Sequence, residues 1–102
     1  MTEHLEVVIF TVKEGERDAF LAKRPAAMAA LSQFDGFVDS RLGEYEDGSW
    51  VDVVQWRSLE EAKVAAETFL EHEAAREWAQ HIDEVRDFRH ARLHHLGDAA
   101  AA

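Results

Sequence analysis

A carboxylate set between two indoles is the arrangement in this sequence that most suggests chemistry. The segment Trp50–Trp56 reads WVDVVQW, which is rich in β-branched and aromatic residues and is typical of a strand. Residues two apart on a strand point to the same face, so Asp52 shares a face with Trp50 and Trp56. Aromatic walls with a few polar groups suit a flat aromatic ligand. Alternatively, both tryptophans belong to the core and Asp52 pairs with Arg41.

A predicted hairpin brings further residues to the same face. The pair Asp47-Gly48 is typical of a two-residue type I′ turn, which needs positive φ at both central positions. In that register Gly43 faces Asp52, and the missing side chain leaves room for a ligand, unless the glycine only marks a bulge. Arg41 lies diagonally from Asp52, and Tyr45 lies on the same face nearer the turn. These residues are candidates for substrate binding.

Hydrophobic periodicity predicts the elements that position this site. We expect strands at residues 5–12, 37–46, 50–56 and 85–96, and helices at residues 16–34 and 59–82. Pro25 should kink or restart the first helix. The polar run Glu71-His72-Glu73 should interrupt the second helix, whose later half then carries His72 and Arg76 over the site.

The resulting β-α-β-β-α-β order predicts an α+β, ferredoxin-like fold with a four-stranded antiparallel sheet and both helices on one face. Residues 1–96 should form a single domain, and residues 97–102 a flexible tail. The first strand contains the consecutive apolar run Val7–Phe10, which predicts cover on both of its faces. A second copy of the chain would cover the face that the helices leave bare, so we expect a homodimer.

Composition limits the classes of function. With 102 residues and 47% hydrophobic residues, the chain is long enough for one real core. A net charge of -10 argues against nucleic acid and anionic membranes as partners. There is no cysteine, and the six histidines show no metal-ligand spacing. A phosphate loop and a GxSxG motif are absent as well, and the N-terminus lacks a signal-peptide pattern, so we expect a cytoplasmic protein.

The run VQWRSLEEA, together with the element order and the length, resembles the antibiotic-biosynthesis monooxygenase family of dimeric α+β barrels. The resemblance extends from about Leu5 to Leu96. Its motifs are a tryptophan that ends the third strand, here Trp56, and a helix opening of the S-x-E-E-A kind. Ser58 and Glu61 in that opening also form a predicted capping box. The resemblance implies that the face carrying Asp52 lies under the helices.

Within this family, the pattern is most similar to quinone-forming monooxygenases of aromatic polyketide pathways, which use neither metal nor flavin. These enzymes carry an asparagine four residues before the strand-three tryptophan and an arginine on the second helix. The corresponding positions here are Asp52, Trp56 and Arg76. The resemblance therefore implies a cofactor-independent monooxygenase that acts with dioxygen on a small, electron-rich hydroxylated aromatic.

The resemblance also implies roles for these residues. Trp56 would wall the pocket and offer its indole N–H to a substrate oxygen, and Arg76 would stabilise the substrate anion. Asp52, or as second choice His72, would take the proton. The aspartate departs from the family's asparagine, so unless it is the base it needs Arg76 or Arg41 to neutralise it.

Two other readings of the same fold remain. The family's aromatic residue early in the second helix is absent, because Ala62 and Lys63 stand there. This departure leaves open a non-catalytic module that binds small molecules or a partner. Haem degradation, known in the same family, is not expected, because the first strand has no asparagine and Ala65 stands near the position of the required tryptophan.

Overall fold

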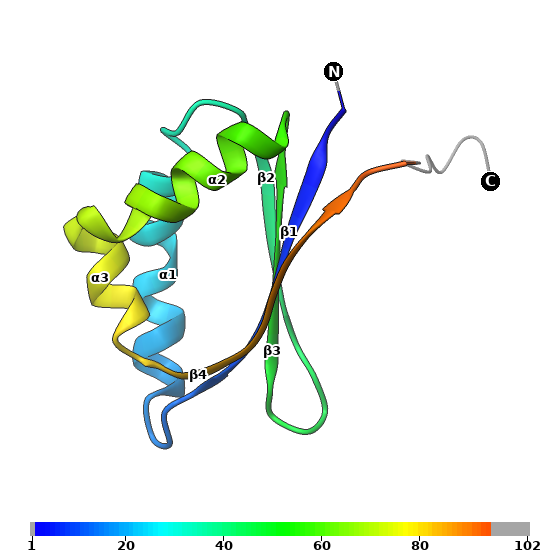
Figure 1. The fold of residues 1–102 in the computed structure, drawn as a ribbon. Coiled ribbons are helices and arrows are strands. Elements are labelled where there is room, and N and C mark those ends of the chain that lie inside the picture. The colour runs from blue at the N-terminus through cyan, green and yellow to red at the C-terminus, as the bar shows by residue number, and fades with distance from the viewer. Residues whose placement is uncertain (1, 95–102) are drawn as a thin grey trace, which may run out of the picture.

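A computed structural model describes residues 2–94 of the chain. Its elements in order are β1 (His4–Val12), α1 (Arg17–Leu31), β2 (Phe37–Glu44), β3 (Trp50–Trp56), α2 (Leu59–Thr68), a 3₁₀ helix η1 (Phe69–Glu71), α3 (Glu73–Ala79) and β4 (Ile82–Arg92). The strands form one antiparallel sheet in the order β2-β3-β1-β4. All three α-helices lie on one side of this sheet (Figure 1). The predicted ferredoxin-like α+β fold is confirmed.

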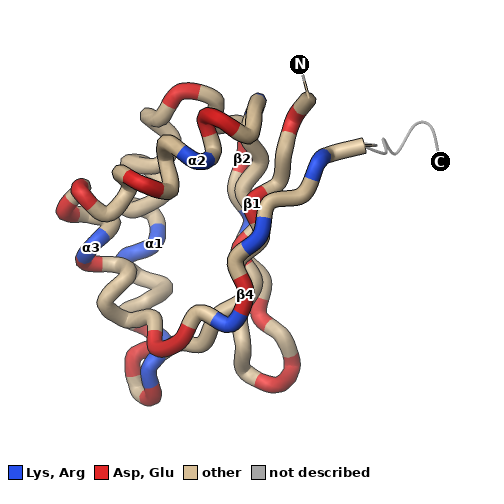
Figure 2. The backbone as a smooth tube through the Cα atoms, in the orientation of Figure 1, with Lys and Arg blue, Asp and Glu red and all other residues tan. Residues whose placement is uncertain are grey.

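The last strand begins earlier than the sequence indicated. It starts at Ile82, which periodicity assigned to the second helix, and it ends at Arg92. Its predicted end at Leu96 and the predicted tail, residues 97–102, lie outside the described residues. The strand is at an edge of the sheet and carries charges of both signs (Figure 2), which is typical of an edge strand.

The predicted face of β3 is confirmed. Its residues alternate strictly between buried and half-buried, and the buried set is Trp50, Asp52, Val54 and Trp56. Trp50, Val54 and Trp56 belong to the two core clusters together with residues of α1 and α2, so this face of β3, Asp52 included, lies under the helices. The sequence left open which face the helices cover, and the resemblance implied this one.

The predicted hairpin register is wrong by one residue. Tyr45 pairs with Ser49 around the three-residue loop Glu46–Gly48, so Leu42 faces Asp52 and Gly43 faces Val51. The loop is a turn followed by Gly48 at φ +90°, a conformation that suits glycine. A one-residue slip sends every side chain of β2 to the other face. Gly43 and Arg41 therefore lie on the face away from the helices.

The helices keep the predicted order with one correction. Pro25 does not restart α1, which runs without a break from Arg17 to Leu31. The second helix does break where the polar run interrupts it, because η1 and the extended residue His72 separate α2 from α3. At the start of α2 the Ser58 hydroxyl oxygen accepts a hydrogen bond from the Glu61 backbone N–H, as the capping motif predicted.

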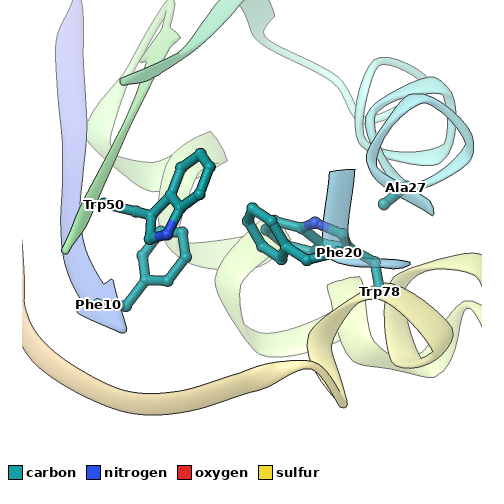
Figure 3. Packing of buried hydrophobic residues seen from close by; sticks show 5 residues of the cluster. All are labelled: Phe10, Phe20, Ala27, Trp50 and Trp78. Atoms are coloured by element: carbon teal, nitrogen blue, oxygen red, sulfur yellow. The ribbon is translucent and has the colours of Figure 1, made fainter. Parts of the chain in front are cut away.

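Aromatic side chains join the helices to the sheet. Phe20 of α1 contacts Phe10, Trp50 and Trp78, with ring centroids 5.1–5.7 Å apart (Figure 3). Ala27 of the same helix completes this cluster. A second cluster nearer the other end of β3 contains Leu31, Val54, Trp56, Ala62 and Ala65. Together the clusters fix α1, α2 and α3 above the strands.

No helix of the described residues lies over the other face of the sheet (Figure 1). Half-buried apolar side chains lie on this face in the two central strands: Leu5, Val7, Ile9, Val51 and Val53. None of the helices in residues 2–94 has the length and apolar character needed to span a lipid bilayer.

Candidate functional site

A cavity of about 380 Å³ lies between the sheet and the helices. Both core clusters contribute to its walls, and most of the lining is apolar. The lining residues are Glu6, Val8, Phe10, Met28, Leu31, Asp52, Val54, Trp56, Ala65, Ala66, Phe69, Leu70, Trp78, Ala79, Ile82, Asp83, Val85 and Phe88. A volume of this size accommodates a small organic ligand.

The exposed end of the cavity is edged by apolar side chains. Leu70 of η1 and Val85 and Phe88 of β4 all line it, and each is about half exposed to solvent. An apolar ligand would bury these side chains as it enters, which favours binding.

Asp52 forms a buried ion pair with a residue that the sequence analysis missed. Arg24 of α1 donates two hydrogen bonds to the Asp52 carboxylate, at 2.7 and 3.0 Å. The two side chains are 12% and 7% exposed, and the guanidinium lies 5.6 Å from the ring centroid of Trp78. Two parallel bonds of this kind orient a carboxylate firmly. Arg24, rather than Arg41 or Arg76, therefore neutralises Asp52.

Glu6 of β1 is a second acidic residue in the cavity wall. It pairs with Val54 on one side and with His90 on the other, so it lies diagonally between Asp52 and Trp56. Burial and the nearby Asp52 charge raise the pKa of Glu6 to about 7. A carboxyl group with such a pKa can both accept and donate a proton near neutral pH.

His90 faces Glu6 from the edge strand. Its Nε2 lies 3.6 Å from Glu6 Oε1, slightly beyond a hydrogen bond. Burial, with smaller contributions from the charges of Lys63 and His4, lowers the pKa of His90. Neither Glu6 Oε1 nor His90 Nε2 has a hydrogen-bond partner among the described residues.

Two indole groups offer unused donors at the cavity. Trp56 and Trp78 both line it, and the Nε1 atom of each is buried without a hydrogen-bond partner in residues 2–94. Buried donors are normally paired, so an unpaired donor at a cavity invites a ligand acceptor. A ligand oxygen would satisfy either group.

The structure brings together only part of the predicted site. Asp52 and Trp56 line the cavity as expected. Arg41 does not: it is exposed on the opposite face of the sheet, where it pairs with Asp39. Gly43 leaves no room beside Asp52, because it lies on that same opposite face. Tyr45 is 47% exposed at the hairpin loop and is not part of the lining.

The two candidates from the second helix also lie away from the cavity lining. Arg76 donates hydrogen bonds to the backbone oxygens of Leu70 and Glu71, at 2.9 and 2.6 Å, and so closes the end of η1. His72 is exposed and packs edge-on against Phe34, with ring centroids 5.4 Å apart. The break at His72 turns α3, and the sequence could not give its direction.

The position of Glu6 in the first strand is itself a signal in the sequence. On β1 the period of two places Glu6 on the same face as Val8 and Phe10, which are core residues. A carboxylate on a core-facing position is unusual and indicates a functional or paired group. Arg24 carried no comparable signal, because its contact with Asp52 spans 28 residues.

No metal site stands out among residues 2–94, where no group of three or more His, Cys, Asp or Glu side chains is arranged to hold an ion.

The fold and the buried cavity define a ferredoxin-like α+β protein with a ligand-sized site beneath its helices. No family model and no curated protein sequence matches the chain. Solved structures do match it. A candidate antibiotic biosynthesis monooxygenase from Bordetella bronchiseptica has a TM-score of 0.72 at 18% identity, over 89% of this chain and 96% of that one.

Two further structures carry the same fold. A candidate antibiotic biosynthesis monooxygenase from Chloroflexus aurantiacus has a TM-score of 0.68 at 13% identity and covers 94% of this chain and 97% of its own. SnoaB from Streptomyces nogalater, a cofactor-independent oxygenase, has a TM-score of 0.67 at 20% identity and covers 97% and 98%. At these identities the likeness establishes the fold of antibiotic biosynthesis monooxygenases over nearly the whole chain.

Proposed function

We propose that this protein is a cofactor-independent monooxygenase of the antibiotic biosynthesis monooxygenase family that converts a small hydroxylated aromatic into a quinone. The observation that carries the proposal is the cavity itself. It has the size and apolar lining for an aromatic ring system, and it is also lined by carboxyl groups and by Trp56, whose indole N–H has no partner in residues 2–94. The similarity to SnoaB supports the same reaction class.

Such a reaction needs little from the protein besides binding and proton transfer. Once its hydroxyl group is deprotonated, an electron-rich aromatic can pass an electron to dioxygen directly. For an anthrone, the methylene carbon takes up one oxygen atom and becomes the second quinone carbonyl. The second oxygen atom leaves as water with the two methylene hydrogens. The cavity would hold the ring, keep bulk water out and stabilise the phenolate.

The chain's own residues divide this work. Trp56 would donate its indole N–H to a substrate oxygen, because that donor is otherwise unpaired. Asp52 is held by Arg24, so it would fix the polar end of the cavity rather than move a proton. The apolar side chains of Leu70, Val85 and Phe88 would close over the bound ring.

The test is oxygen uptake with a hydroxylated anthrone, compared with the uncatalysed rate. Trp56→Phe should lower kcat about tenfold or more, because one donor to the developing charge is lost. Trp50→Phe is the matched control: Trp50 is a buried tryptophan on the same strand face, but it does not line the cavity. Quinone formation that no cavity variant changes would refute the site.

One observation favours a second candidate, a non-catalytic module that binds small aromatics. Arg24 is paired with Asp52, and Arg76 donates to the backbone at the end of η1. No arginine of residues 2–94 is among the cavity-lining side chains, so none is in place to stabilise a substrate anion. A binding module predicts tight, saturable binding of hydroxylated aromatics with oxygen uptake no faster than without protein. The same assay therefore separates the two functions.

We further propose that two copies of the chain associate through the sheet face that has no helix. Its apolar side chains, Val7 and Val53 among them, are only half buried in one copy. A second sheet packed against them would remove this surface from water.

A further inference from the structure

We propose that Glu6 and His90 form the acid–base pair of the cavity: Glu6 takes the proton of the substrate hydroxyl, and His90 passes that proton to solvent. This assignment rests on the proposed function and names a base that the sequence analysis did not consider. It replaces Asp52 and His72 in that role.

The first support is the position of the two residues in the sheet. Glu6 and His90 are direct cross-strand partners on neighbouring strands, and both point to the helix side. Trp56 is the diagonal neighbour of Glu6 on β3. A substrate whose oxygen accepts a hydrogen bond from the Trp56 indole N–H would therefore have a hydroxyl group within reach of the Glu6 carboxylate.

The second support is that both groups are unused by the fold. The Glu6 and His90 side chains are 13% and 17% exposed, and their facing atoms lie 3.6 Å apart without a hydrogen-bond partner in residues 2–94. Buried polar atoms are normally satisfied, so an unsatisfied carboxyl in a cavity wall requires an explanation. A substrate hydroxyl group would donate a hydrogen bond to the Glu6 carboxylate. The proton that this hydroxyl releases would then bind to His90 Nε2.

The third support is the charge around the pair. Asp52 is the diagonal neighbour of Glu6 on β3 and is paired with Arg24 of α1, while Asp83 lines the same cavity from β4. Lys63 on α2 and His4 on β1 act on His90. Burial and Asp52 together raise the pKa of Glu6 to about 7, and burial lowers the pKa of His90. Glu6 can therefore take up and release a proton near neutral pH, where the lowered pKa of His90 leaves the imidazole free to accept one.

Asp52 is a poorer base for a geometric reason. Both of its carboxylate oxygens already accept hydrogen bonds from the Arg24 guanidinium, at 2.7 and 3.0 Å. Protonating it would break that pair and leave a buried arginine without its partner. Glu6 loses nothing comparable when it takes up a proton.

The proton balance is simple. The bond between the substrate oxygen and its hydrogen breaks, and the hydrogen goes to Glu6 Oε1, which leaves a neutral carboxylic acid and a substrate phenolate. Glu6 then transfers the proton to His90 Nε2, and the imidazolium releases it to water at the edge strand. Glu6 returns to a carboxylate, and the product, formed as its phenolate, regains a proton from water. The pair is therefore unchanged, and no net proton is released, after each turnover.

The first experiment compares Glu6→Gln and His90→Gln with the wild-type protein in the anthrone oxidation assay. Glu6→Gln should lower kcat at least a hundredfold, the usual scale for losing a general base, while KM changes little. His90→Gln removes the group that passes the proton to solvent, so it should also lower kcat, by about tenfold or more but less than Glu6→Gln does. Glu46→Gln, an exposed loop variant, is the control. Turnover of Glu6→Gln within about threefold of wild type would overturn the assignment.

The second experiment does not need turnover. A hydroxyanthraquinone cannot be oxidised further at the ring position, and its absorption spectrum reports ionisation of the hydroxyl group. Wild-type protein should bind it as the phenolate at a pH where the free compound is neutral, and Glu6→Gln should bind it only as the neutral phenol. If the spectra differ in this way but the protein consumes no oxygen, the Glu6–His90 proton transfer is supported and the proposed monooxygenase activity is refuted. Equal spectra in the two proteins would refute the pair, whatever the activity.

Discussion

Arg24 and Asp52 form a buried bidentate pair that joins α1 to the central part of the sheet. Their N–O distances are 2.7 and 3.0 Å, and the guanidinium also stacks over Trp78 of α3. One arginine therefore contacts three elements that are distant in sequence. A second pair seven residues earlier, Arg17 with Glu44, repeats the arrangement over Trp50 at the surface.

The first prediction concerns the stability of the buried pair. Asp52→Ala should lower the free energy of unfolding by about 3–5 kcal/mol, because it leaves the Arg24 guanidinium buried without a counter-charge. Arg17→Ala removes an ion pair whose side chains are 57% and 35% exposed, so water screens the charges and the loss of stability should be much smaller. Urea denaturation of both variants measures the difference. Equal losses would contradict the assigned difference in burial.

The second prediction separates structure from catalysis at Asp52. Asp52→Asn keeps the shape and one acceptor oxygen, so it should weaken the pair and lower stability while oxygen-dependent turnover falls less than about tenfold. A collapse of turnover by a hundredfold or more in a folded Asp52→Asn protein would make Asp52 the base and would count against Glu6. The unfolding midpoint, measured on the same samples, keeps the two effects apart.

The third prediction is a pH dependence of stability that comes from Glu6. Its pKa rises from 4.5 to about 7 on folding, so the folded state holds a proton that the unfolded chain has already released. The stabilising contribution is complete below pH 4.5 and is lost as pH rises through 7. The loss amounts to about 3 kcal/mol by pH 8. Glu6→Gln should remove this slope and become more stable relative to wild type at pH 8 than at pH 5.

Other titrations set the conditions for that measurement. The lowered pKa of His90 adds stability as pH rises towards its ordinary value of 6.5, which opposes the Glu6 effect. The comparison is therefore repeated in a His90→Asn background. The pKa values of Glu44 and Asp47 are lowered by hydrogen bonds, so their contributions are lost only below their ordinary values. A slope unchanged by Glu6→Gln between pH 5 and 8 would show that Glu6 does not titrate there.

The fold could be predicted from the sequence because each element carries a regular pattern. The period of two in Trp50–Trp56 and the capping residues Ser58 and Glu61 define local structure, and local structure follows from neighbouring residues. The register of the β2–β3 hairpin was harder to predict from the sequence. Asp47-Gly48 suits either a two-residue turn or the end of a three-residue loop, and the Asp47 carboxylate accepts bonds from the Ser49 N–H and hydroxyl that fix the longer loop.

The site was less predictable than the fold because its polar contacts join distant segments. Asp52 and Trp56 were identified from one strand, but the partner of Asp52 comes from α1, and Glu6 comes from β1. The error in register placed Arg41 and Gly43 on the wrong face. No local sequence pattern indicates which arginine of a helix will contact a carboxylate on a distant strand.

The fourth prediction concerns Arg76, for which the family resemblance implies at least a hundredfold loss of turnover in Arg76→Ala. The structure leads to a different expectation. Arg76 donates to the backbone oxygens of Leu70 and Glu71 and does not line the cavity, so Arg76→Ala should lower stability by about 1–2 kcal/mol and leave kcat within about threefold. A hundredfold loss with unchanged stability would instead mean that the side chain turns into the cavity when substrate binds.

The last prediction tests the proposed association of two copies through the bare face of the sheet. Val53 lies at the centre of this face, opposite Val7 on β1. Val53→Glu would place a charge among apolar side chains that a second copy covers, and the cost of burying it unpaired should shift a dimer to monomers at micromolar concentration. Sedimentation velocity measures the shift. Val64→Glu is the control, since Val64 is 56% exposed on α2 on the helix side. A wild-type protein that sediments as a stable monomer would refute the association, whereas a dimer that survives Val53→Glu would place the interface on another surface.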